Sequence, residues 1–200
     1  DMIRCAKLAR DRGLAGPIWG HVTPGNTLWM NQAIPRPPRS ISNAKAILAA
    51  ASFSWKDGKL FDPKGNLVEF TILVSSSNAQ KARVATVVQD DLRQLGMKVA
   101  IVSLEFRTML DRIFKRVDYD AAVMSVDSGD ADPNSEMNVW VSGGNMHLWN
   151  LNSKPQTSWE EEIDRLMRRQ MITLDRQERK RIYDRVQQVV AIHRVLRHVR

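Results

Sequence analysis

Hydrophobic and polar residues alternate between positions 67 and 74, and the period then changes. Four apolar residues occupy every second position, as in a strand with one buried face: Val68, Phe70, Ile72 and Val74. From 78 to 95 the apolar positions recur at intervals of three and four, the period of an amphipathic helix. Asn78 before this segment and Gly96 after it are residue types that begin and end helices. The pattern predicts a strand followed by a helix.

The same alternation of periods continues to residue 124. Residues 97–104 have the pattern of a second strand, 106–115 that of a second helix, and 117–124 lead into a short apolar third strand. A β-α-β-α-β order with right-handed crossovers requires parallel strands with helices packed against them. The predicted fold class is therefore α/β, with a parallel sheet flanked by helices.

The segments around this core are organised differently. Residues 1–60 begin with a helical pattern, continue through a proline-rich loop from Pro17 to Ser40, and include a short helix capped by Ser42. Two turns follow, at 55–58 and 62–65. After the core at 67–125, the pattern predicts loops over residues 126–157 and a basic tail over 193–200. Between them, residues 158–192 are predicted to form a helical hairpin, whose two helices begin with capping boxes at Ser158 and Asp175. Two hundred residues suit a single domain, which we expect over 1–200.

Composition and charge narrow the class of protein. At 43% hydrophobic and 26% charged residues, the chain has the composition of neither a disordered nor a membrane protein. The formal net charge of +8 suggests a basic α/β nucleic-acid-binding domain as one alternative. Much of the excess lies beyond residue 160, however, where basic and acidic residues are interleaved as on solvated helix faces. We therefore expect no nucleic-acid partner.

The first candidate site is an acidic loop after the third strand. Ligands of open parallel sheets gather at the carboxyl ends of the strands, so ligand contact is predicted for a run of four residues: Asp127, Ser128, Gly129 and Asp130. A second interpretation has Asp130 and Asp132 capping the turn and the helix after Pro133, and both interpretations stay open. A metal-assisted hydrolase using Asp127, Asp130 and Asp132 is a further alternative.

The second candidate site lies in the loop that follows. Trp140, Asn145 and His147 offer stacking and hydrogen bonds suited to a small ligand or a peptide. Trp149, in contrast, is predicted to pack against the rest of the domain and to hold the loop in place. The four histidines lack neighbours at zinc-ligand spacing, and neither a phosphate-binding glycine loop nor a nucleophile elbow occurs. We predict no catalytic residue, no cofactor and no metal.

An ordered series of short motifs resembles one known family. The series comprises Trp55-Lys-Asp-Gly58, the stretch 87–99, Tyr119-Asp-Ala-Ala122 and Asp130-Ala-Asp-Pro133, followed by positions in 159–183. In this order they are similar to the bacterial family 5 extracellular solute-binding proteins, which are the oligopeptide, dipeptide and nickel receptors of ABC importers. The basic tail 193–200 lacks the apolar, proline-containing strand usual there.

The resemblance implies a non-catalytic receptor that closes two lobes on a peptide or other small solute. The implied fold is a lobe of the periplasmic-binding-protein kind. The chain would supply most of the C-terminal lobe, and the N-terminal lobe would precede residue 1. The implied partner is the membrane permease of an ABC importer, and the implied form is a monomer in a periplasmic or extracytoplasmic, membrane-associated location. In peptide-binding relatives an aspartate of the acidic loop pairs with the peptide's amino group. Gly129 stands at the matching position, between Asp127 and Asp130, so the identity of the ligand stays open.

Overall fold

The computed structural model describes residues 20–35, 38–125 and 131–193. These residues form two compact units. The first unit is 38–125, and the second combines 20–35 with 131–193. The first holds the parallel sheet and the second holds the helical hairpin. Within the described ranges, no helix combines the length and the apolar character that crossing a bilayer requires.

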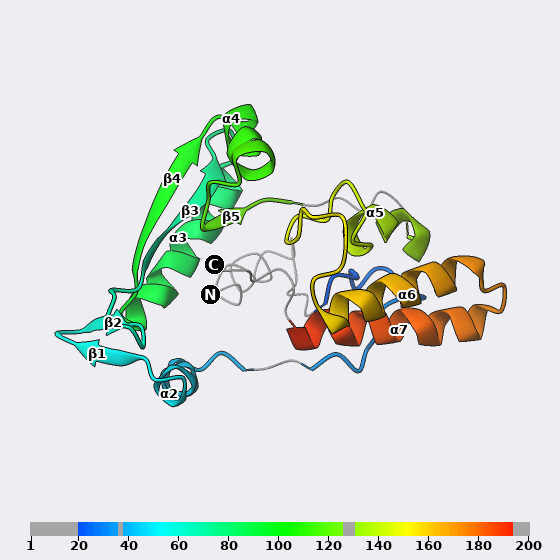
Figure 1. The fold of residues 1–200 in the computed structure, drawn as a ribbon, viewed down its shortest axis with the longest axis horizontal. Coiled ribbons are helices and arrows are strands. Elements are labelled where there is room, and N and C mark those ends of the chain that lie inside the picture. The colour runs from blue at the N-terminus through cyan, green and yellow to red at the C-terminus, as the bar shows by residue number, and fades with distance from the viewer. Residues whose placement is uncertain (1–19, 36–37, 126–130, 194–200) are drawn as a thin grey trace. The chain divides into compact units, whose positions relative to one another are not determined.

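A three-stranded parallel sheet forms the centre of the first unit (Figure 1). Strand β3 (Glu69–Ser75) lies in the middle and pairs in parallel with β4 (Lys98–Leu104) on one side and β5 (Ala121–Val123) on the other. Helix α3 (Ala79–Gln94) connects β3 to β4. Helix α4 (Phe106–Asp111) and a π-helical turn at Arg112–Arg116 connect β4 to β5. The predicted β-α-β-α-β order and the parallel sheet are confirmed.

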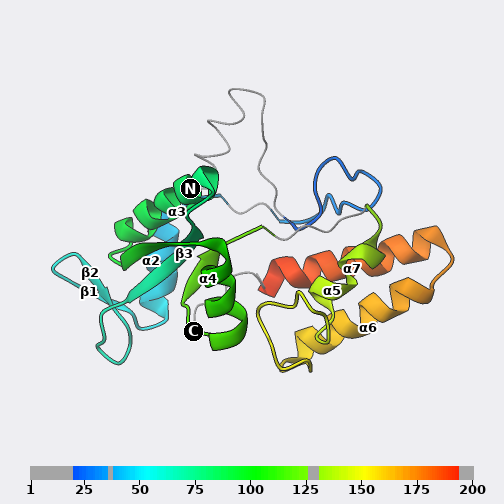
Figure 2. The same ribbon diagram turned by 90° about the horizontal axis from the view of Figure 1, so that it is seen from above.

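Strand β3 is buried on both faces because a helix covers each of them (Figure 2). Ile72 and Val74 pack with Ala85 of α3 in one apolar layer. Leu73, which points to the opposite face, packs with Met109 and Ile113. The alternating apolar residues thus face α3, while the intervening Leu73 supplies the second layer. A strand covered in this way reads as a nearly continuous apolar run.

The segments before the sheet differ from the prediction in their details. Helix α2 (Ile41–Ala50) is capped by Ser40, whose hydroxyl accepts a hydrogen bond from the Asn43 amide at 3.1 Å; the predicted cap, Ser42, is wrong. The turn predicted at 55–58 joins two short antiparallel strands, β1 (Ser54–Lys56) and β2 (Lys59–Phe61). This hairpin packs on Gly96, where a Cβ would lie 2.8 Å from the Gly58 carbonyl oxygen. Glycine at the end of α3 therefore allows the hairpin to approach.

Two long helices dominate the second unit, α6 (Ser158–Ile172) and α7 (Arg176–His193), which lie side by side as the predicted hairpin (Figures 1 and 2). A 3-10 turn at Pro133–Glu136 leads into the short helix α5 (Met137–Trp140). These elements share one core with the loop 20–35, which contributes Val22 and Trp29. Thr157 and Glu160 form the capping box of α6. The cap therefore lies one residue before Ser158, which was the predicted cap.

Candidate functional site

The predicted site residues fall into two groups. Asp127, Ser128, Gly129 and Asp130 lie outside the described residues. Trp140, Asn145 and His147 lie in the second unit, within or just after α5. The side chains of Trp140 and His147 are buried, with exposures of 3% and 2%, whereas Asn145 is exposed. Among these three, only Asn145 presents its side chain to solvent.

Asp132 closes the acidic loop and has a structural role. Its carboxylate accepts a hydrogen bond from the Asn134 amide at 2.9 Å, which caps the turn after Pro133 as one of the two interpretations predicted. The same carboxylate accepts two hydrogen bonds from the guanidinium of Arg179, at 2.8 and 2.5 Å. Arg179 holds the pKa of the Asp132 carboxyl below its ordinary value. The carboxylate is therefore ionised at neutral pH and fixed to α7.

Arg179 of α7 contacts three other segments of the second unit. Besides Asp132, its guanidinium reaches the backbone and side-chain oxygens of Gln170 near the end of α6, at 3.1 and 3.0 Å. The guanidinium carbon also lies 5.0 Å from the centre of the Trp29 ring, within the range of a cation–π contact. Sequence reasoning missed this residue because it is one of many arginines in 160–200 and its partners are distant in the chain.

Trp140 belongs to a buried network around the carboxylate of Glu136. The indole Nε1 donates to Glu136 Oε2 at 2.7 Å, and the Tyr183 hydroxyl donates to the same oxygen at 2.5 Å. His21 Nε2 lies 3.1 Å from the Tyr183 oxygen and 3.3 Å from Glu136 Oε2. Because Tyr183 gives its hydrogen to Glu136, a neutral His21 donates from Nε2. Burial lowers the pKa of His21 to about 3 and raises the pKa of Glu136.

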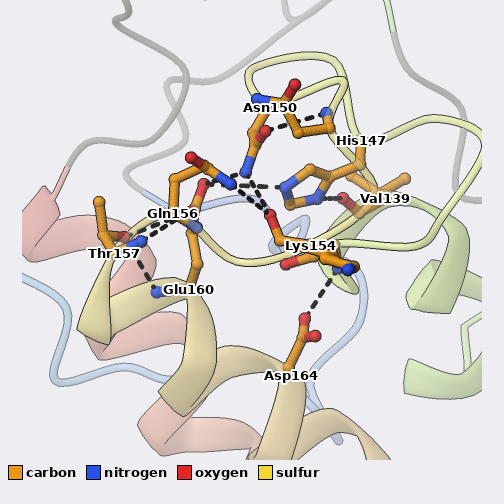
Figure 3. A network of polar contacts seen from close by, with 10 residues as sticks. Val139, His147, Asn150, Lys154, Gln156, Thr157, Glu160 and Asp164 are labelled. Atoms are coloured by element: carbon orange, nitrogen blue, oxygen red, sulfur yellow. Dashed lines mark hydrogen bonds and ion pairs between the residues drawn. The ribbon is translucent and has the colours of Figure 1, made fainter.

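His147 belongs to a second buried network, beneath the loop that follows α5 (Figure 3). Its Nδ1–H donates to the Val139 carbonyl oxygen at 3.0 Å. Its Nε2 lies 3.9 Å from Glu160 Oε1, the geometry of an ion pair only when the ring is protonated. Burial, partly offset by the Val139 carbonyl and the Glu160 carboxylate, lowers the pKa of His147. At neutral pH the ring is therefore uncharged and serves to position Val139.

The carboxylate of Glu160 is the centre of this second network (Figure 3). Its oxygens accept hydrogen bonds from the backbone amides of Gln156 and Thr157, at 2.6 and 3.0 Å. The side-chain amide of Asn150 donates to it at 3.3 Å and also to the Lys154 carbonyl at 2.9 Å. One turn further along α6, Asp164 accepts from the Ser142 amide at 2.7 Å. The loop 142–157 is thus held at both ends by carboxylates of α6.

These two networks support the loop from beneath. Its exposed residues are Gly143 and Asn145 near its beginning and, further along, 151–154, Gln156 and Thr157. The buried carboxylates and imidazoles are engaged in hydrogen bonds within the protein. In the described ranges, no three His, Cys, Asp or Glu side chains come together as a group that could hold a metal ion. Around Asn145, the loop surface offers amide groups that can donate and accept hydrogen bonds.

The carboxyl edge of the sheet adds hydroxyl groups that sequence reasoning missed. Ser75 is the last residue of β3, and Ser76 and Ser77 follow it. The Ser75 and Ser77 hydroxyls are 2.9 Å apart. Ser76 donates its amide to the Leu104 carbonyl at 2.7 Å, and Ser76 and Ser77 are exposed. This is the edge at which open parallel sheets bind ligands. The signal in the sequence was three consecutive serines at the end of the first predicted strand.

We expect the second unit to lose stability as the pH falls below about 6.5. The unfolded histidines take up protons near pH 6.5, whereas folded His21 does so only near pH 3 and folded His147 below its ordinary pKa. Between these values the unfolded chain binds more protons, so the free energy of unfolding falls by up to about 1.4 kcal/mol per pH unit for each histidine. Glu136, whose folded pKa is raised, opposes this trend, because the folded residue takes up its proton at a higher pH than the unfolded residue does.

Urea unfolding followed by tryptophan fluorescence at pH 7.5 and pH 5.5 measures this change. His147→Gln should show a smaller loss of stability between the two pH values than the parent chain does. Equal or greater stability of the parent at pH 5.5 would contradict the assignment of neutral buried imidazoles.

Comparison with known proteins places this fold in a family. The family described as "Bacterial extracellular solute-binding proteins, family 5 Middle" matches residues 8–147. A "Probable ABC transporter-binding protein" of Deinococcus radiodurans is 28% identical over 188 residues, which cover 88% of this chain and 32% of that protein. The "Probable D,D-dipeptide-binding periplasmic protein DdpA" of Escherichia coli K12 is 32% identical over 120 residues, 60% of this chain and 22% of the relative.

Solved structures show the same fold. The chain superimposes on Agrobacterium fabrum MelB, a periplasmic binding protein in complex with stachyose, with a TM-score of 0.81 and 21% identity, covering 95% of this chain and 30% of that one. For the oligopeptide-binding protein AppA of Bacillus subtilis in complex with a nonapeptide, the TM-score is 0.73, the identity 23%, and the coverage 89% and 35%. The chain spans at most about a third of these relatives' lengths. Because the family match extends over more than half of its residues, the chain belongs to the bacterial extracellular solute-binding proteins of family 5.

Proposed function

We propose that the chain is part of the substrate-binding component of an ABC importer and that it takes part in binding a peptide or another small polar solute without transforming it. The family match over residues 8–147 carries this proposal. The similar structures were solved with a nonapeptide, with stachyose and with a nickel–histidine complex. These ligands differ in size but share groups that form hydrogen bonds with backbone and side-chain polar atoms.

In the proposed mechanism, the solute lies between this chain and a second lobe of a longer receptor, and a hinge motion closes the two on it. The acidic loop 127–130 and Asn145 contact the solute. Trp140 and His147 position the loop from beneath, because their side chains are buried and hydrogen-bonded to Glu136 and Val139. The receptor is a monomer outside the cytoplasm and presents its closed form to the membrane permease.

The basic residues of the hairpin do not favour the nucleic-acid alternative. Arg168 pairs with Asp164, Arg169 with Glu178 and Arg185 with Glu162, at 3.1, 2.6 and 2.7 Å. Arginines held by acids of the same hairpin present a weaker field to a phosphate backbone than unpaired ones.

Purification of the longer parent protein under native conditions, followed by mass spectrometry, tests the proposal. We expect one discrete solute to co-purify and to be released on unfolding. The double variant Asp127→Asn/Asp130→Asn should retain less of it, whereas Asp57→Asn, in an exposed turn of the first unit, should retain as much as the parent. The proposal is wrong if no solute co-purifies and no peptide, sugar or metal chelate raises the melting temperature, or if the protein turns over a solute.

A further inference from the structure

Residues 171–175, the end of α6 and the turn that follows it, are called the α6–α7 turn and expose three apolar side chains that the core does not use. Met171, Ile172 and Leu174 are 51%, 76% and 100% exposed. The core stripe of α6 consists of Ile163, Leu166, Met167 and Gln170, and the exposed residues lie outside it. The turn forms one end of the second unit in both views (Figures 1 and 2). Apolar side chains that stay exposed in the folded protein contribute no burial free energy to its stability.

Basic residues are concentrated on both sides of this turn, and five of them form ion pairs with acids of the second unit. Residues 165–181 contain seven arginines and lysines but only two acidic residues, Asp175 and Glu178. Both acids are engaged within the hairpin: Asp175 accepts from the Glu178 amide at 2.6 Å, and Glu178 pairs with Arg169 and Arg181. The side chains of Arg165 and Arg176 are exposed, and neither forms a hydrogen bond or an ion pair with another described residue.

Charge is distributed unevenly along the hairpin. The beginning of α6 is acidic, with Glu160, Glu161, Glu162 and Asp164 within five positions. The end of α6 and the beginning of α7 are basic. A field with this polarity directs the turn, rather than the opposite end of the hairpin, toward a negatively charged surface.

We propose that the α6–α7 turn docks on a membrane surface that contains anionic lipids. Ile172 and Leu174 would enter the interface between headgroups and acyl chains, and Arg165 and Arg176 would meet the lipid phosphates. A nucleic acid would leave the apolar side chains without a role. An acidic protein would need a pocket for a convex apolar turn, whereas a bilayer accommodates such a turn without one. The combination of charge and exposed apolar groups is the one by which peripheral proteins bind bilayers.

Co-sedimentation of the 200-residue chain with lipid vesicles tests this proposal. Vesicles of phosphatidylcholine alone are compared with vesicles that contain phosphatidylglycerol as well, at low and at high NaCl concentration. We expect binding to the phosphatidylglycerol vesicles that weakens as salt is added, because salt screens the arginines. Arg165→Gln and Arg176→Gln should each weaken partitioning by about fivefold, and Ile172→Ser/Leu174→Ser should weaken it by about tenfold.

Ile47→Ser provides the matched control, because Ile47 is 62% exposed but lies on α2 in the first unit. It should bind vesicles as the parent does. All substituted side chains are exposed, and the melting temperatures should agree with the parent's. The proposal is overturned if the chain does not bind phosphatidylglycerol vesicles, or if Ile172→Ser/Leu174→Ser binds them unchanged. It is also overturned if these two substitutions instead abolish a dimer seen by light scattering, since the turn would then be a contact between copies of the chain.

Discussion

Gly144→Ala should destabilise the second unit by about 3 kcal/mol, the upper end of the usual cost of overpacking. A Cβ at this position would lie 2.1 Å from the carbonyl oxygen and 2.6 Å from the carbonyl carbon of Asn138. Neither atom can move freely, because the oxygen accepts a hydrogen bond from the Met146 amide at 3.0 Å and Asn138 lies within α5. The added methyl group must therefore displace the loop that carries Asn145.

The neighbouring glycine is the control for this substitution. A Cβ at Gly143 would meet nothing within 4 Å, so Gly143→Ala should leave the free energy of unfolding within about 1 kcal/mol of the parent value. Urea unfolding followed by tryptophan fluorescence reports mainly on this unit, which contains four of the described tryptophans: Trp29, Trp140, Trp149 and Trp159. Equal stabilities of the two variants would show that the loop does not approach Asn138 in solution.

Glu160→Ala should also cost the second unit about 3 kcal/mol, because it removes the acceptor of several buried and part-buried donors at once. The amides of Gln156 and Thr157 and the side chain of Asn150 would lose their partner, and the capping box of α6 would be broken. Glu160→Gln should cost less, since a side-chain oxygen remains in place but can accept fewer hydrogen bonds.

Glu161→Ala serves as the matched control, since Glu161 is the next residue of α6 and is exposed. We expect a change within about 0.5 kcal/mol. The same urea titration measures all three variants. A loss for Glu160→Ala no larger than that for Glu161→Ala would mean that the carboxylate does not hold the loop.

The sheet could be predicted from the sequence because its signals are local. The period of two in 68–74 and the periods of three and four in 84–95 each specify an element without reference to distant residues. The helix caps were harder to place. Ser40 and Ser42 are both suitable caps for α2, as are Thr157 and Ser158 for α6, and neighbouring hydroxyl residues look alike in the pattern. Strands β1 and β2 have three residues each, too few to show a period.

The candidate site was less predictable because its contacts span the chain. His21 meets Tyr183 across 162 positions, and Asp132 meets Arg179 across 47. No local pattern signals such pairs. Trp140 and His147 were predicted as ligand contacts because they can stack and form hydrogen bonds, but the same properties suit them to partners inside the protein, where both side chains lie.

The discontinuity of the second unit has a consequence for folding during synthesis. Residues 38–125 can fold as soon as they leave the ribosome, because the parallel sheet and its helices lie within one continuous segment. Val22 and Trp29 are made earlier but must wait for Tyr183 and Val186, which complete their core. At ordinary rates of translation this delay is on the order of ten seconds. During that interval the nascent chain exposes an apolar segment that a chaperone could recognise.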